Sequence, residues 1–152
     1  MIYLLLLLSQ LFCNTFYIPN DYNSIQSGIN NASSGDTIIV NPGIYFENIT
    51  IDNKVLFIMS ANGPDSTIID GSPNYSPVIS FNNIMDSPIE ISGFTIQNGT
   101  GEFIENSSFG GGILSKNSVS RLTELIIKDN NAFAGGGICY YSQNLINDIS
   151  FI

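Results

Sequence analysis

The sequence contains no histidine and no tryptophan, and only four of its 152 residues are basic. The lack of histidine excludes Ser-His-Asp and Cys-His catalytic systems and every histidine metal site. Four scattered basic side chains in a chain of net charge −9 form no positive surface for nucleic acid or for an anionic membrane. We therefore expect no nucleic-acid partner.

Cysteine is also scarce, since Cys13 and Cys139 are the only two. If Cys13 is removed with a leader, one thiol remains, which excludes an intrachain disulfide and a cysteine metal site. The acids form no D-x-D-x-D-G loop for calcium, and the glycines form no G-x-x-x-x-G-K-[ST] loop for phosphate. We predict neither a metal nor a cofactor.

The N-terminus carries the one long apolar run, Ile2–Phe12. At about 11 residues it is too short to span a bilayer and has the length of a signal-peptide core. We interpret residues 1–15 as a signal peptide and expect a secreted or cell-surface protein with no membrane span in the mature chain. A buried strand or helix is the alternative, and lipidation at Cys13 is disfavoured because Phe12 precedes it.

Isoleucine, asparagine and serine are the commonest residues, which favours many short strands joined by sharp turns. Residues 16–36 are predicted to be an extended lead-in followed by a capping helix. The helix covers Ser24 to Ala32, with Ile25 and Ile29 on one face and Asn23 or Ser24 as its N-cap.

Short apolar segments separated by Gly, Pro and Asn clusters predict strands through the rest of the chain. They are expected at 37–40, 44–47, 49–51, 55–59, 67–69, 78–81, 89–91, 94–96, 113–115, 125–127, 138–140 and 149–151.

A repeat determines how these strands are arranged. Gly110-Gly-Gly-Ile113 returns 25 residues later as Gly135-Gly-Gly-Ile138, and each copy is followed by a second apolar run. A fixed offset of this size is typical of a solenoid. With three strands per turn it predicts a parallel β-helix of about five coils over residues 37–152, with Ile113 stacked on Ile138 and Leu125 on Ile149.

The glycine triplets are interpreted as corners, where the next coil passes close and a Cβ would not fit. One departure from the repeat stands out, because Phe94 and Gly110 are six residues further apart than Leu125 and Gly135. The excess lies between residues 100 and 108 and holds Glu102 and Glu105. Insertions in solenoids often lie on a binding face, so these two form a candidate ligand loop; a solvated excursion is the alternative.

Three stretches carry a resemblance to a known group of proteins. Residues 22–29, 35–40 and 42–47 resemble the N-terminal capping region of the pectin lyase-like superfamily, and 92–99 with the two G-G-G-I units resembles its β-helix repeats. The resemblance implies an all-β, right-handed parallel β-helix of secreted bacterial type, and polysaccharide-related activities. Its catalytic aspartate and arginine motifs have no counterpart, since Arg121 is the only arginine.

No catalytic residue is therefore assigned. Ile149–Phe151 is an apolar strand with no cap after it, so we expect the chain to be part of a longer protein. The first hypothesis is a non-catalytic β-helix module for cell-surface attachment or extracellular polysaccharide binding. The second is the N-terminal part of a lyase, esterase or hydrolase acting on acidic polysaccharides, with catalytic residues beyond residue 152.

Overall fold

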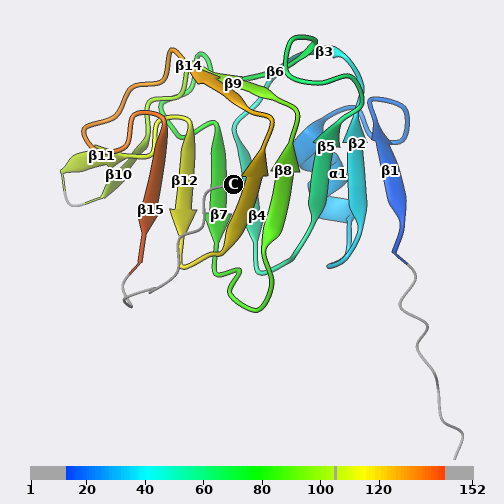
Figure 1. Cartoon of the computed structure of the whole chain (residues 1–152). Helices are drawn as coiled ribbons and strands as arrows, with labels where there is room; N and C mark the ends of the chain where they lie inside the picture. Colours follow the sequence, from blue (N-terminus) through cyan, green and yellow to red (C-terminus); the bar gives the residue numbers. More distant parts are fainter. Residues whose placement is uncertain (1–12, 105, 143–152) are drawn as a thin grey trace, which may run out of the picture.

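A computed structural model describes residues 13–104 and 106–142, and these are predominantly β, with one helix (Figure 1). The strands form three parallel sheets and one antiparallel hairpin. The stack runs from β1 at one end to β15 and the hairpin at the other. The prediction of an all-β chain of stacked parallel strands is confirmed.

Each of the three parallel sheets takes one strand from every passage of the chain. Sheet A contains β1 (Thr15–Ile18), β2 (Thr37–Val40), β5 (Phe57–Ser60), β8 (Ile89–Ser92) and β13 (Ser120–Thr123). Sheet B contains β3 (Gly43–Phe46), β6 (Thr67–Asp70), β9 (Thr95–Gln97) and β14 (Ile126–Lys128). Sheet C contains β4 (Ile49–Asp52), β7 (Ile79–Asn82), β12 (Ile113–Lys116) and β15 (Ile138–Tyr141).

The chain visits sheets A, B and C in turn, and we call one such passage a rung. Rung 1 is β2–β4, rung 2 is β5–β7, rung 3 runs from β8 to β12, and rung 4 is β13–β15. Like side chains stack on the inner faces, as in the column of Ile49, Ile79, Ile113 and Ile138 in sheet C. Strand alternation buries these columns in one core, and the predicted stacking of Ile113 on Ile138 is confirmed.

Helix α1 (Ile25–Asn31) covers one end of this core and packs against β1, β2 and β4. Ser24 is the N-cap, and it forms a reciprocal capping box with Ser27. The carboxylate of Glu47 accepts hydrogen bonds from the backbone N–H groups of Ile25 and Gln26, both at 2.9 Å. The predicted capping helix is confirmed, with its apolar face formed by Ile25 and Ile29.

Corners are turned by single residues with positive φ. After sheet C these are Asn53, Asn83 and Asn117, at 52°, 56° and 45°. Gly110 and Gly135 have φ of 62° and 64°. An ideal Cβ on Gly112 would lie 2.6 Å from the carbonyl oxygen of Gly137, so the interpretation of the triplets as close-packed corners is confirmed.

The spacing between rungs is not constant, in contrast to the 24–25 residue period expected from the sequence. Paired residues are 20 apart from β2 to β5 (Thr37 and Phe57) but 34 apart from β7 to β12 (Ile79 and Ile113). Only β12 and β15 keep the 25-residue offset of the glycine repeat. Connections between sheets absorb the difference, so the strands stay in register while the corners vary in length.

The predicted six-residue excess forms a hairpin of β10 (Glu102–Ile104) and β11 (Ser107–Phe109), between β9 and β12. Its antiparallel pairing separates it from the three sheets (Figure 1). Residues 1–12 of the predicted signal peptide and the predicted strand at 149–151, with the stacking of Leu125 on Ile149, lie outside the described residues.

Candidate functional site

The candidate ligand loop is anchored to sheet C by one of its two acids. The Nζ of Lys116, on β12, donates to both carboxylate oxygens of Glu102, at 2.7 and 2.9 Å. Their side chains are 25% and 39% exposed, so the ion pair is open to solvent on one side. Glu105 lies outside the described residues. The structure therefore places Glu102 at the outer face of sheet C.

That face carries a line of polar side chains, which we call the polar row: Asp52, Asn82 and Lys116, with Glu102 bound to Lys116. Asp52 pairs in register with Asn82, and Asn82 with Lys116, on the neighbouring strands β4, β7 and β12. Each is the last residue of its strand and follows a buried, inward-facing one, so alternation turns it outward. The row thus crosses three consecutive rungs at the strand spacing of about 4.8 Å.

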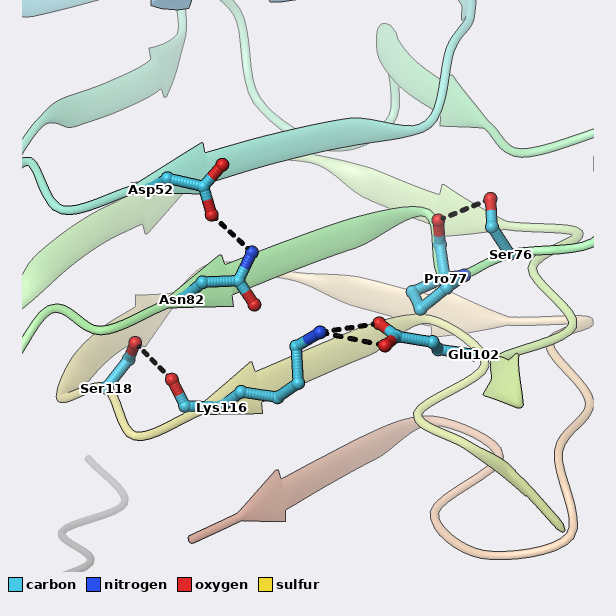
Figure 2. A network of polar contacts seen from close by, with 7 residues as sticks. All are labelled: Asp52, Ser76, Pro77, Asn82, Glu102, Lys116 and Ser118. Carbon is cyan, nitrogen blue, oxygen red and sulfur yellow. Dashed lines mark hydrogen bonds and ion pairs between the residues drawn. The ribbon is translucent and has the colours of Figure 1, made fainter. Parts of the chain in front are cut away.

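Hydrogen bonds join the row in pairs (Figure 2). Asn82 donates from Nδ2 to Oδ1 of Asp52, and these two side chains point toward one another. The Oδ1 of Asn82 is buried and has no hydrogen-bond partner among the described residues. Donors and acceptors alternate along the row from Asp52 to Glu102, with one link, between Asn82 and Lys116, left unmade.

The hairpin bounds the row on one side. Opposite Glu102 on the hairpin is Phe109, whose ring centroid lies 6.0 Å from that of Tyr141 on β15. Beside Lys116 on the outer face, Leu114 is fully buried. The hairpin is therefore fixed to sheet C by one ion pair and one aromatic contact, and it shields an apolar side chain that would otherwise face water.

The chemistry available to this row is hydrogen bonding with partial charge balance. It presents two carboxylates, one ammonium group and one amide, and each carboxylate already holds a donor. No group of three or more His, Cys, Asp or Glu residues suited to a metal ion occurs in residues 13–104 and 106–142. Such a row suits a ligand rich in hydroxyl groups, which both donate and accept.

Asp70 has a different role from the row, although it too ends a strand. It is only 5% exposed, and it accepts hydrogen bonds from the N–H and Oγ of Ser72 and from the amides of Gln97 and Asn98. Burial raises the pKa of this carboxyl, but the four hydrogen bonds outweigh burial and hold the pKa below its usual value. The network joins rungs 2 and 3, so Asp70 is a structural residue.

Sequence reasoning located Glu102 but missed the polar row. A usable signal was present, because β4, β7 and β12 all end in a polar residue after an alternating segment: I-T-I-D, I-S-F-N and I-L-S-K. Those ends are 30 and 34 residues apart, so a search at the 24–25 residue period did not align them.

Comparisons with known proteins add no identity to this site. No family model matches the chain, and neither the curated proteins nor the solved structures include a significant match. Among the described residues, no helix has the length and apolar character needed to cross a membrane. The geometry of the polar row therefore carries the functional argument.

Proposed function

We propose that this chain is a non-catalytic module of an extracellular or cell-surface protein, which binds polysaccharide on the outer face of sheet C. Its scaffold is a right-handed parallel β-helix of the pectin lyase-like kind. The ordered visits to three parallel sheets and the capping helix support that architecture. The resemblance in residues 22–47 and 92–99 supports the superfamily and the secreted location.

The polar row is the observation that carries the proposal. It offers alternating acceptors and donors over three rungs, repeated at a fixed step along a straight, rigid surface. A polysaccharide is an extended polymer with hydroxyl groups at regular intervals, and a row of this kind contacts several sugar units together. Because strands rather than loops position the row, little ordering free energy is lost on binding.

The row favours binding over catalysis. General acid–base hydrolysis of a glycosidic bond needs two carboxyl groups on either side of the bond, one of them protonated. Here Asp52 accepts from an amide and Glu102 from an ammonium group, and both partners stabilise the ionised form. The alternative, a lyase, esterase or hydrolase of acidic polysaccharides, requires residues other than these.

The test is affinity electrophoresis and titration calorimetry of the purified chain with soluble neutral and acidic polysaccharides, followed by an assay for cleaved or unsaturated products. We expect binding without product. Asp52→Ala and Lys116→Met should each weaken binding about tenfold, the value of roughly 1.4 kcal/mol for one lost charged hydrogen bond.

The matched control is Asp65→Ala, which removes an exposed carboxylate from the connection between β5 and β6. It should leave the affinity within about twofold, since a surface charge away from the site contributes little. Equal effects of Asp52→Ala and Asp65→Ala, or no binding to any polysaccharide, would overturn the proposal. Product formation by the unmodified chain would favour the enzyme instead.

A further inference from the structure

A cleft of about 570 Å³ lies at the corner where the chain passes from sheet C to sheet A. Its wall is formed by residues 34–35 and 53–57 on one side and 83–90 on the other. Asn53 and Asn83, which follow Asp52 and Asn82 in the chain, lie at its edge, so the cleft begins where the polar row ends. Its volume is in the range of small-molecule binding sites.

One long connection builds the cleft. At this corner the connections of rungs 1 and 3 cover residues 53–56 and 117–119, whereas that of rung 2 covers the longer span 83–88. Ile84 anchors it to the following rung: its N–H donates to the Oγ of Ser118 at 3.1 Å, and its carbonyl accepts from Val119 at 2.7 Å. The connection therefore overhangs a preformed hollow.

Apolar side chains make most of the lining. Val55 and Phe57 are half-buried, Ile84 is buried, and Met85 is 55% exposed. An exposed methionine beside a concave apolar wall leaves water in contact with surface that a ligand would cover. A flat, planar or branched hydrocarbon body fits such a wall.

The charged groups at the cleft are not equally available. Lys54 donates from Nζ to the carbonyl oxygens of Ile29 and Ala32, both at 2.9 Å, at the end of α1. Glu90 forms an ion pair of 3.1 Å with Arg121. Asp86 is exposed and has no hydrogen bond or ion pair within residues 13–104 and 106–142. The charge left for a ligand is therefore negative.

We propose that this cleft is a second binding site, which takes a small organic cation: an apolar body against Val55, Phe57 and Ile84, and an amine beside Asp86. The net charge of −9 attracts cations to the surface in general, and the cleft selects those with an apolar body. The proposal depends on the cleft alone and is independent of polysaccharide binding.

Three probes of similar shape and different charge test it: phenethylamine, 2-phenylethanol and phenylacetate. Two-dimensional NMR titration of the full chain reports both affinity and location. We expect phenethylamine to shift resonances of residues 53–57 and 84–88, with an affinity at least about fivefold above that of the alcohol, and no shifts with phenylacetate.

Asp86→Asn removes the charge at an exposed position and keeps the shape, and Asp65→Asn is its matched control. Asp86→Asn should abolish the preference for the amine while the alcohol still binds, and Asp65→Asn should preserve that preference. Equal binding of all three probes, an amine preference that survives Asp86→Asn, or no shift at the cleft with any probe would each refute the proposal.

Discussion

The two glycine triplets make possible a matched substitution, because Gly112 and Gly137 occupy the same position of the repeat on neighbouring rungs. Neither has positive φ, so alanine is compatible with the backbone conformation at both. Their surroundings differ. A Cβ on Gly112 would lie 2.6 Å from the carbonyl oxygen of Gly137 and 2.9 Å from Nδ2 of Asn130, whereas a Cβ on Gly137 meets Ile127 at 3.6 Å, an ordinary contact.

Gly112→Ala therefore forces rungs 3 and 4 apart at this corner. Overpacking against backbone costs about 1–3 kcal/mol. The displacement also stretches the bond from Gly112 N–H to the Gly136 carbonyl, now 3.0 Å, which contributes about 1 kcal/mol. We expect Gly112→Ala to lower the free energy of unfolding by about 2–4 kcal/mol. Gly137→Ala should change it by less than about 0.5 kcal/mol, since alanine also reduces the entropy of the unfolded chain.

Urea denaturation followed by far-ultraviolet circular dichroism measures both variants against the unmodified chain. The m-value should stay constant, so that the shift in midpoint reports stability alone. If Gly112→Ala proves as stable as Gly137→Ala, the rungs do not approach as closely as described, and the account of the triplets as corners fails.

Three further predictions concern carboxylates. Because the pKa of Asp70 is lower in the folded than in the unfolded chain, its contribution is complete above about pH 5 and is lost as pH falls through the folded pKa; Asp70→Asn should cost about 1–3 kcal/mol at pH 7 and flatten the acid limb of a stability–pH curve, and an unchanged curve would contradict this. Glu47→Gln should cost about 1 kcal/mol in the same urea assay, because it weakens the acceptor for two N–H groups at the start of α1, and a loss independent of salt would argue against a dipole contribution. Glu102→Gln should cost no more than about 0.5 kcal/mol at low salt and nothing at high salt, since its pair with Lys116 is partly exposed; a larger loss in thermal unfolding would mean that the hairpin supports the core.

Local patterns predicted much of the fold. Ser24 with Ile25 and Ile29 was enough to place α1, since caps and amphipathic spacing are properties of adjacent residues. The equivalence of Gly110 and Gly135 also located the extra residues that form the hairpin. Leu122–Ile127 was read as one apolar run, but Glu124, with φ of 52°, divides it into β13 and β14. A turn made by a glutamate has no recognisable sequence signal.

The candidate site was less predictable because its members are brought together by register. Asp52, Asn82 and Lys116 lie far apart in the sequence, and their alignment depends on the summed lengths of three connections in each rung. Connection lengths do not follow from hydrophobic periodicity. Glu102 was found only because it lies in an insertion, and its partner Lys116 became apparent from the geometry.

The uneven spacing of the rungs shows which parts of this architecture tolerate change. Neighbouring rungs differ by as much as 14 residues in offset, from 20 to 34, yet the strands on either side remain in register. Side-chain stacking fixes the strands, while the corners after sheets A, B and C impose little constraint on length. The connections at 61–66, 71–78 and 83–88 are accordingly positions for grafting foreign peptides, and a graft at each would display three segments at three edges of one rung.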